Sequence, residues 1–420
     1  MRYNRFILVL IDYAIVSIFY WIFSGSIPAS ILLPIVIFIA LFSFRSYEKE
    51  HLSDFNESLV RAFVSLIFGN LINYVLLRLI YLSLMETPGR VRLTGLVLHT
   101  IFTAPSLTLI NFFLFKALKK NVAPARFAVV GKKEEFEQLF KEIEQKSEDY
   151  CFVDYISDEE HLKRLNSDLS GIVIADYEIF QSLKHKLANN HLQLIFLPHI
   201  AETVLKRIPL ILIDKFNSYY ETSFNKILET VLKRILDIVL STILLVLTSP
   251  AMLFVSLAIY LEDGRPIIYR QKRVGKNGEE FEFIKFRSLK QEGFDPKDPS
   301  RNIEQRLLKI GKFIRKYRLD ELPQLWLVLK GTMSLVGPRP EMVEYHLKYC
   351  KQIPYYDYRL KVKPGLTGWA QIMYKYASNL EETKVKLQYD LYYVKNCSFL
   401  LDLKIIMQTL ETVLWRRGAR

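Results

Sequence analysis

The sequence predicts a membrane α-helical N-terminal domain, a central α/β domain and a mainly α-helical C-terminal domain that contains a re-entrant membrane helix. Three observations support this fold class. Half of the 420 residues are hydrophobic, and four long apolar runs lie within residues 1–120. Short apolar runs then alternate with polar, helix-like stretches over residues 124–215, as in a parallel α/β sheet. Another apolar run, broken by a proline, opens the last part, residues 233–420.

The four N-terminal apolar runs cover residues 6–23, 31–44, 59–84 and 96–118, and most approach the roughly 20 residues that span a bilayer. The first lacks a small-residue cleavage site and further runs follow it, so we expect a retained helix rather than a signal peptide. The distribution of lysine and arginine around the runs places both ends of this domain in the cytoplasm. Asp12, a charge within the first run, is expected to pair with protein groups.

The central part opens with a short buried-type strand at residues 126–131, followed by a charged helix at 132–146. Four further apolar runs predict strands at residues 151–156, 171–175, 192–197 and 208–213. After Gly131, Lys-Lys-Glu-Glu replaces the Gly-x-Gly-x-x-Gly pattern that lets a pyrophosphate approach the backbone. We therefore expect a regulatory or assembly domain rather than a dinucleotide enzyme, followed by a linker at 216–232.

The apolar run at residues 235–261 is interrupted by Thr-Ser-Pro, in which Ser249 and Pro250 break the helix. A fifth transmembrane span with a tolerated proline is one interpretation. A full span, however, would carry the large basic domain that follows to the outside of the cell, away from cytoplasmic nucleotides. We therefore favour a re-entrant hairpin over residues 233–262, which enters and leaves the same leaflet.

The adjacent carboxylates Asp320 and Glu321 stand at the centre of a strongly basic stretch. Arg315 precedes them, and Arg339 follows within a rigid Gly-Pro-Arg-Pro segment. Nearby cations are expected to lower the pKa of both carboxyl groups and keep them ionised. Ionised carboxylates attack phosphorus or hold Mg²⁺, and guanidinium groups bind phosphate oxygens bidentately. This chemistry indicates phosphoryl transfer rather than a solvated helix face.

An apolar stripe predicts that the carboxylate pair sits on a packed helix; it comprises Leu322, Leu325, Trp326 and Leu329. Upstream, Arg273, Lys285 and Arg287 are candidates for contacts with phosphate or a lipid headgroup, with a plain solvated surface as the alternative. Downstream lies a rigid loop at 363–371. The final helix, about 400–414, ends in Trp-Arg-Arg, a pattern of interfacial anchors.

Lysine and arginine number 57 against 44 aspartates and glutamates, a net charge of +13. In a membrane protein this balance indicates anionic headgroups and phosphorylated ligands. The chain lacks zinc-finger spacing and a helix-turn-helix signal, so nucleic acid is not an expected partner. The three cysteines are far apart and predict neither a metal framework nor a disulfide scaffold.

Leu-Asp-Glu-Leu-Pro-Gln at 319–324 and Met-Ser-Leu-Val-Gly-Pro-Arg-Pro at 333–340 resemble motifs of the bacterial sugar transferase family, the polyprenyl-phosphate glycosyl-1-phosphate transferases. The resemblance runs from about Lys233 to the end of the chain. It includes Tyr-x-Gln-x-Arg-x-Gly, Lys-Phe-Arg-Ser, Pro-Gly-x-Thr-Gly and the Ser-Pro break. The chain departs from the usual residues at Arg318, Leu327 and Thr332. The two earlier parts resemble the four membrane helices and the Rossmann-like domain of the family's large form.

The resemblance implies transfer of a sugar 1-phosphate from a UDP-sugar to undecaprenyl phosphate, with release of UMP. This step initiates exopolysaccharide, capsule or lipopolysaccharide synthesis. The resemblance implies that Asp320 attacks the β-phosphorus and that Glu321, with Asp320, holds Mg²⁺. Arg315 and Arg339 would grip phosphate oxygens.

In the same resemblance, Pro338 and Pro340 clamp the loop around its arginine and support the nucleotide. The protein is expected to be a multi-pass protein of the bacterial inner membrane, in contact with the lipid bilayer, whose catalytic domain faces the cytoplasm. Whether it forms a homo-oligomer is left open. The alternatives are a catalytically silent membrane scaffold of a glycan-assembly complex and an NAD-dependent sugar-nucleotide enzyme.

Overall fold

The computed structural model describes residues 5–24, 27–44, 46–52, 55–84, 93–118, 124–158, 160–161, 168–187, 192–226, 229–290, 306–374 and 377–414. It divides into two compact units, Met1–Ala123 and Pro124–Arg420. The predicted Trp-Arg-Arg anchor lies outside the described residues, as do several of the charges used to orient the N-terminal helices.

The first unit is helical, and its helices are α1 (Arg5–Ser24), α2 (Ile27–Ser43), α3 (Lys49–Leu52), α4 (Phe55–Leu84) and α5 (Leu93–Leu118). Among the described helices of this unit, α4 and α5 contain stretches long and apolar enough to cross a membrane, whereas the apolar parts of α1 and α2 are shorter. The helical N-terminal region with apolar helices is thus confirmed. Asp12 is buried and accepts hydrogen bonds from Tyr47 (2.7 Å) and Asn111 (2.8 Å), the structural pairing predicted for it.

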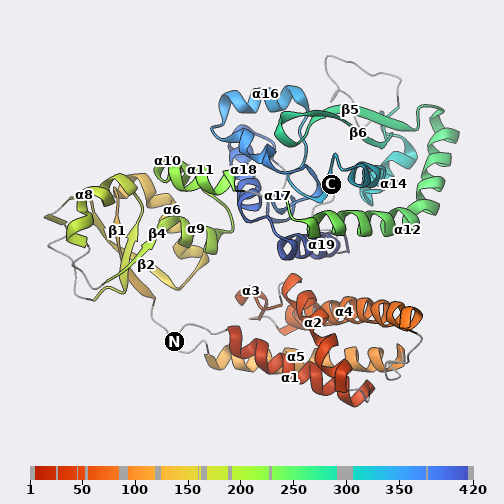
Figure 1. The fold of residues 1–420 in the computed structure, drawn as a ribbon, viewed down its shortest axis with the longest axis horizontal. Coiled ribbons are helices and arrows are strands. Elements are labelled where there is room, and N and C mark those ends of the chain that lie inside the picture. The colour runs from red at the N-terminus through yellow and green to blue at the C-terminus, as the bar shows by residue number, and fades with distance from the viewer. Residues whose placement is uncertain are drawn as a thin grey trace. The chain divides into compact units, whose positions relative to one another are not determined.

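The second unit opens with a parallel four-stranded sheet in the order β2-β1-β3-β4 (Figure 1). The strands are β1 (Ala125–Val130), β2 (Tyr150–Ile156), β3 (Gly171–Ile174) and β4 (Gln193–Phe196). The side chains of alternate residues of β1 point to opposite faces of the sheet. Phe127 and Val129 pack with α6 (Lys133–Lys146) and α9 (Leu197–Leu205), and Ala128 and Val130 pack with α8 (Tyr177–Leu187). The predicted parallel α/β arrangement is confirmed.

Two expectations for the end of this region need correction. The run at 208–213, predicted as a strand, forms α10 (Leu210–Lys215), which begins directly after Pro209. Proline lacks the N–H that a sheet ladder needs but suits the start of a helix. The predicted linker at 216–232 contains α11 (Asn217–Asn225), which buries Tyr220 and Phe224 and is therefore part of the packed unit.

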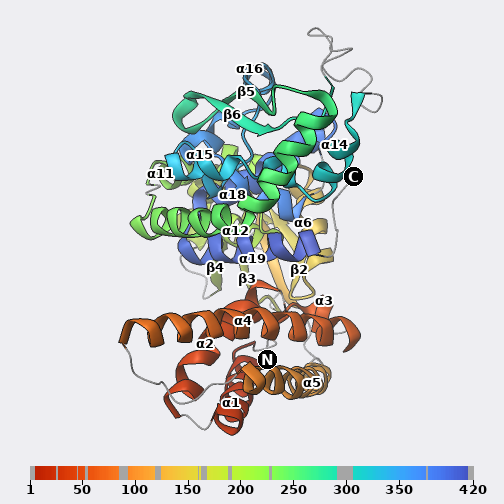
Figure 2. The ribbon, with the colours of Figure 1, turned by 90° about the vertical axis from the view of Figure 1, so that its right-hand side faces the viewer.

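The proline-broken run forms α12 (Val231–Asp263), which contains Pro250. Figures 1 and 2 both show that α12 changes direction along its length. Proline removes a backbone hydrogen bond, and the Ser249 hydroxyl donates to the carbonyl of Val246 at 2.8 Å, which also favours a bend. The large apolar side chains near this point are mostly exposed, with Leu247 at 71% and Leu253 at 72%.

The rest of the second unit is mainly helical around two small sheets. Its elements are β5 (Ile268–Val274), β6 (Glu280–Phe286), α14 (Lys309–Lys316), the 3₁₀ turn η2 (Leu319–Glu321), α15 (Gln324–Lys330), β7 (Ser334–Val336), α16 (Val343–Gln352), the 3₁₀ segment η3 (Tyr356–Lys361), β8 (Gly365–Thr367), α17 (Trp369–Met373), α18 (Leu380–Asn396) and α19 (Phe399–Leu414). Strands β5 and β6 form an antiparallel hairpin, and β7 pairs with β8 in parallel.

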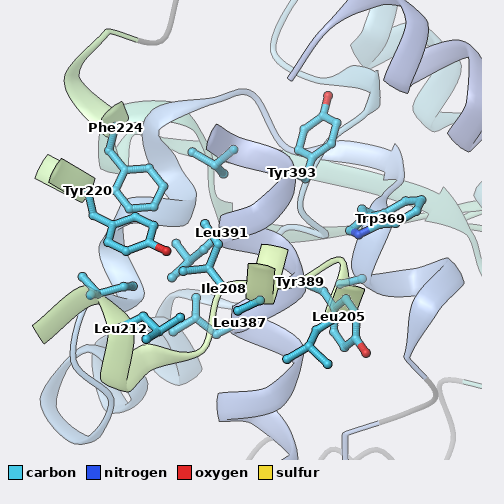
Figure 3. Packing of buried hydrophobic residues seen from close by; sticks show 14 of the residues in the cluster. Leu205, Ile208, Leu212, Tyr220, Phe224, Trp369, Leu387, Tyr389, Leu391 and Tyr393 are labelled. Carbon is cyan, nitrogen blue, oxygen red and sulfur yellow. The ribbon is translucent and has the colours of Figure 1, made fainter. Parts of the chain in front are cut away.

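The α/β part and the C-terminal part share one hydrophobic core. Figure 3 shows the side chains that meet there: Leu205, Ile208, Leu212, Tyr220 and Phe224 from the first, and Trp369, Leu387, Tyr389, Leu391 and Tyr393 from the second. The indole N–H of Trp369 donates to the carbonyl of Lys206 at 2.9 Å, and the Ile208 N–H donates to the carbonyl of Gln388 at 3.0 Å. The two parts are therefore packed together as one compact unit.

Candidate active site

Asp320 and Glu321 lie in the 3₁₀ turn η2, between α14 and α15. Arg318, just before the turn, adopts a left-handed conformation with φ 55°. This backbone reversal, together with Pro323, delays α15 until Gln324, so the pair precedes the packed helix rather than sitting on it. Leu325 is buried as predicted, but Trp326 is 61% exposed and does not belong to the packed stripe.

The Gly337-Pro338-Arg339-Pro340 loop follows β7 and is held by the segment at 363–371, which the sequence predicts as a rigid loop. The Gly337 N–H donates to the carbonyl of Thr367 at 2.9 Å, and the Gly365 N–H donates to that of Pro338 at 3.0 Å. A Cβ on Gly337 would collide with the carbonyl oxygen of Lys363. Only glycine allows this close approach of two backbones.

Arg339 meets Glu321 directly: its Nη2 donates to Glu321 Oε1 at 2.7 Å. Burial on its own would raise the pKa of Glu321, but Arg339 outweighs it, with smaller contributions from Arg318 and Lys285. The pKa of Glu321 therefore lies below its usual value, as the sequence predicted. Glu321 is ionised at neutral pH and joins the arginine loop to the turn of Asp320.

Asp320 behaves differently. Burial, and then the negative charge of Glu321, raise the pKa of Asp320 above its ordinary value of 3.8, against the opposing effects of Lys285 and Arg315. The prediction that nearby cations lower the pKa of both carboxyl groups is therefore wrong for Asp320. The reason is desolvation, because Asp320 is only 8% exposed. An ionised carboxylate with a raised pKa is also a more basic, more reactive nucleophile.

Three further cations of the predicted site reach this turn from other elements. Lys285 on β6 and Arg315 on α14 act electrostatically on Asp320, and Arg315 Nε also donates to Ser288 Oγ at 2.8 Å. Burial lowers the pKa of Lys285, and Asp320 partly offsets this. Arg273 on β5 stacks over the Phe283 ring at 4.6 Å and donates to the carbonyl of Pro340. The β5–β6 hairpin, α14, the turn η2 and the arginine loop therefore meet around the two carboxylates.

The clamping prolines lie beside this cluster. Pro338 and Pro340 line a hollow of about 10 Å³ with Arg339 and Arg359, room for roughly one water molecule. The clamp and the nucleotide contact inferred for Pro338 and Pro340 from the resemblance stay predictions.

Arg287 does not join the cluster. Its guanidinium pairs with the carboxylate of Asp263 and donates to the carbonyls of Asp263 and Gly264, each at 2.9 Å. These groups end α12, so Arg287 caps that helix. The predicted phosphate contact is corrected to a structural role, because the guanidinium is 5% exposed and already engaged.

Lys233 and Asp237 tie the start of α12 to β7, the strand that leads into the arginine loop, a role that the sequence did not reveal. Lys233 Nζ donates to the carbonyl of Val336 at 2.9 Å and pairs with Asp402 at 2.7 Å. Asp237 Oδ1 accepts from the Leu335 N–H at 2.9 Å. Charges at the start of an apolar run are ordinarily attributed to membrane orientation, but an aspartate within such a run is costly in a membrane and was a usable signal for a protein partner.

Arg359 supports the loop from the other side. It is 2% exposed, and its Nη2 donates to the carbonyl of Arg339 at 2.7 Å and pairs with Asp390 at 3.0 Å. Glu341, directly after the loop, pairs with Lys386 at 2.8 Å. Arg359 lies 20 residues from Arg339, and no local pattern marks it, so only the folded structure identifies it.

The donor set at the turn limits how a metal ion could bind. Within the described ranges, no three histidine, cysteine, aspartate or glutamate residues gather as a metal site. Asp320 and Glu321 are two adjacent carboxylates, and Mg²⁺ is often held by one or two carboxylates together with substrate phosphates. The site thus fits Mg²⁺ that arrives with a phosphorylated substrate, not an ion enclosed by protein ligands alone.

Residues 228–416 match the family model described as "Bacterial sugar transferase". The chain is 42% identical over 172 residues to the UDP-N-acetylgalactosamine-undecaprenyl-phosphate N-acetylgalactosaminephosphotransferase of Aeromonas hydrophila, covering 41% of each chain. It is 42% identical over 170 residues to an uncharacterised sugar transferase of Bacillus subtilis (strain 168), covering 40% of this chain and 79% of the relative. It is 39% identical over 163 residues to the UDP-glucose:undecaprenyl-phosphate glucose-1-phosphate transferase of Escherichia coli (strain K12), covering 38% of this chain and 35% of the relative.

The matched region extends from just before α12 to the last helix and contains the whole cluster around Asp320. The apolar helices of the first unit and the four-stranded sheet lie outside it. The chain spans about two fifths of the Aeromonas relative and about a third of the Escherichia relative.

Proposed function

Since this chain belongs to the bacterial sugar transferase family, we propose that it transfers a sugar 1-phosphate from a UDP-sugar to undecaprenyl phosphate. The products are UMP and an undecaprenyl-diphosphate-linked sugar, and the step initiates synthesis of a surface polysaccharide. One observation carries the proposal: within the matched region, a buried carboxylate, Asp320, is set among Lys285, Arg315 and the Arg339–Glu321 pair. A nucleophile among phosphate-binding cations is what this reaction requires.

In the first half-reaction, a carboxylate oxygen of Asp320 attacks the β-phosphorus of the UDP-sugar. A new oxygen–phosphorus bond forms to Asp320, and the bond from that phosphorus to the bridging oxygen breaks, so that UMP leaves with the bond's electron pair. Arg339 and Arg315 neutralise charge on the phosphate oxygens as it develops. Desolvation of Asp320 removes the hydration that would otherwise weaken its attack, while Lys285 opposes the rise in the pKa of Asp320.

In the second half-reaction, a phosphate oxygen of undecaprenyl phosphate attacks the phosphorus held on Asp320. The acyl-phosphate bond breaks, the lipid takes the sugar phosphate, and the Asp320 carboxylate is regenerated. Two successive displacements let one site serve first a soluble and then a lipid substrate.

Mg²⁺ is the expected cofactor, and Asp320 and Glu321 are the residues that would hold it. When bound, it supplies positive charge that neutralises the diphosphate of the donor. Glu321 remains ionised for this purpose because Arg339 lowers its pKa. The same bond to Arg339 fixes the direction of the Glu321 carboxylate.

The lipid substrate reaches the site along α12, which we place as a re-entrant helix in the cytoplasmic leaflet. A straight helix of 33 residues would be about 50 Å long and would cross the roughly 30 Å hydrocarbon core. Its two ends, however, contact the same folded unit: Lys233 bonds to Val336, and Val255 and Ile259 pack with Phe286. One unit cannot lie on both sides of a bilayer, which supports a helix that returns to the leaflet it entered. The bend containing Pro250 and the exposed apolar side chains around it agree with this placement.

The proposal places the protein in the bacterial inner membrane with Asp320 on the cytoplasmic side, where UDP-sugars are made. The apolar helices α4 and α5 would anchor the first unit in the same membrane. A catalytically silent scaffold would need none of the charge arrangement around Asp320.

The test is UMP release by the purified full-length protein with Mg²⁺, undecaprenyl phosphate and a panel of UDP-sugars. Asp320→Asn keeps the shape of the site and removes the nucleophile, and Glu282→Gln, on the exposed face of the hairpin, is the matched control. Release with at least one sugar, lost in Asp320→Asn and retained in Glu282→Gln, supports the transferase. No release with any sugar would favour the scaffold.

A further inference from the structure

A cavity of about 670 Å³ lies in the α/β part, at the carboxyl ends of β3 and β4, and within the described residues it shares no lining side chain with the Asp320 cluster. Its volume falls within the range of about 300–1,000 Å³ that is usual for small-molecule sites. The walls come from the starts of α8, α9 and α11 and the end of α10. They include Tyr177, Phe196, His199, Asp214, Phe216 and Tyr219.

The usual ligand position in such a sheet is closed by the chain itself. Ligands of parallel α/β folds bind outside the carboxyl ends of the strands, where the strand order reverses, here between β1 and β3. Lys215 bridges that point: its Nζ pairs with Glu135, in the first turn after β1, and with Asp176, directly after β3, each at 2.7 Å. Burial on its own would lower the pKa of Lys215, but the two carboxylates outweigh this effect. The pKa of Lys215 therefore lies above its usual value, and the bridge stays charged. The open space is displaced by one strand, to β3 and β4.

Aromatic rings dominate the open space. Tyr177 and Phe196 are each 42% exposed, and both rings contact Phe216, with centroids 6.3 and 6.2 Å away. Partly exposed rings in a concave site offer flat faces on which another planar group can stack. Isolated exposed aromatic residues need no explanation, but several that share one hollow indicate a ligand.

Two carboxylates stand among the polar groups of the cavity, beside side chains such as Asn217 and Ser218 that both donate and accept hydrogen bonds. Glu178 and Asp214 bring carboxylates to the cavity, while the ammonium of Lys215 is held by its own two carboxylates. An aliphatic lipid chain would offer these carboxylates no donors, and a phosphate would be repelled by them. We propose that the cavity binds a nucleoside, with the base stacked on Tyr177 and Phe196 and the ribose hydroxyls donating to Asp214 and Glu178.

Asp214 also links the cavity to the arginine loop. Its Oδ1 accepts a hydrogen bond from the Tyr355 hydroxyl at 2.5 Å, and this bond raises the pKa of Tyr355 to about 12. Tyr355 directly precedes η3, whose Arg359 donates to the carbonyl of Arg339. A nucleoside that engages Asp214 competes with Tyr355 and so shifts the support of Arg339. This second step, regulation of the transferase, rests on the proposed function, whereas binding itself does not.

Binding is tested by saturation-transfer NMR on the full-length protein in detergent, with uridine, cytidine, adenosine and guanosine as probes. Ser218→Trp places an indole in the cavity, because Ser218 is an exposed residue of its lining. Ser182→Trp, at an exposed position of α8 outside the lining, is the matched control. At least one nucleoside should bind the wild type and Ser182→Trp, and its signal should disappear in Ser218→Trp.

A second variant guards against misfolding of the first. Phe196→Leu stays apolar but loses the stacking face, and should weaken binding roughly tenfold. No binding by the wild type, or binding that survives both Ser218→Trp and Phe196→Leu, would overturn the proposed site.

The effect of the nucleoside on the transferase is measured separately from its binding. In the UMP-release assay, the bound nucleoside should change KM for the UDP-sugar in the wild type and in Ser182→Trp but not in Ser218→Trp. Nucleoside binding without any change in KM would overturn the coupling through Tyr355. Nucleoside binding in a protein that releases no UMP would refute the proposed transferase and leave the site standing.

Discussion

Arg339 donates from Nη2 to Oε1 of Glu321 at 2.7 Å, across 18 residues of sequence. This bond joins the two motifs that carry the chemistry, the 3₁₀ turn of Asp320 and the Gly-Pro-Arg-Pro loop. A guanidinium has five N–H donors, so one bond to Glu321 is compatible with a grip on phosphate oxygens. Arg339 therefore orients the Glu321 carboxylate, and we propose that it also binds the phosphate oxygens of the substrate.

Replacing Arg339 by lysine should show that its forked geometry matters more than its charge. Arg339→Lys keeps a positive charge near Glu321 but cannot contact Glu321 and phosphate oxygens at once in the same plane. We expect kcat/KM for the UDP-sugar to fall about a hundredfold. Arg318→Lys is the control, because Arg318 is half exposed and its nitrogen lies 4.0 Å from Glu321. Equal losses in the two variants would contradict this role of Arg339.

Lys285 should set the acid limit of the reaction. Asp320 must be ionised to attack, so activity is present above its folded pKa and is lost as pH falls through it. Lys285 lowers that pKa against the effect of burial, and its removal must raise it further. In Lys285→Met the acid limb of the kcat/KM–pH profile should move to higher pH. Lys272→Met, whose side chain is exposed on the other strand, should leave the limb in place. An unmoved acid limb in Lys285→Met would exclude this coupling.

Arg287 should prove to be a residue of stability rather than of substrate binding. Arg287→Gln leaves the Asp263 carboxylate, which is 26% exposed, without its cation at the end of α12, and the loss of hydrogen bonds to a charged group should cost about 1.5–3 kcal/mol. The unfolding temperature should fall, while KM for the UDP-sugar in the folded fraction stays near that of the wild type. The exposed pair Arg270–Glu282 gives the comparison, and Arg270→Gln should cost about 1 kcal/mol or less. A raised KM with unchanged stability would contradict this structural role and support the predicted contact of Arg287 with phosphate.

The two ends of α12 should be accessible from one side of the membrane. Val231→Cys and Arg265→Cys place single thiols at exposed positions, on the first residue of α12 and just after its end, once the three native cysteines are replaced by serine. A membrane-impermeant maleimide should label both positions in inverted membrane vesicles and neither in intact cells. Labelling of the two positions from opposite sides would show a full span.

The helical and α/β regions could be predicted from the sequence because they follow from periodicity. Apolar runs of membrane length and the alternation of short runs with polar stretches are local signals. The predictions of secondary structure were wrong where one or two residues override the local apolar pattern. Pro209 turns an apolar run into α10, and Arg318 with Pro323 moves the carboxylate pair from a helix to a turn.

The members of the candidate site were predictable, but their environment was not. Asp320, Glu321 and Arg339 stand in short motifs that can be read along the chain. Three features depend on contacts between distant segments of the chain. They are the desolvation of Asp320, the binding of Arg287 to the end of α12, and the hydrogen bond from Arg359 to the carbonyl of Arg339. Charge near a carboxylate is visible in a sequence, whereas its burial is a property of the fold.

The central claim, that Asp320 becomes phosphorylated by the donor, is tested most directly by intact-protein mass spectrometry. The protein is mixed with Mg²⁺ and the UDP-sugar that supports UMP release, without undecaprenyl phosphate, and quenched rapidly. The account predicts an added mass of one sugar phosphate, located on the peptide that contains Asp320. The adduct should be absent in Asp320→Asn and discharged by adding undecaprenyl phosphate. Turnover with no adduct on rapid quenching, or an adduct that persists in Asp320→Asn, would contradict it.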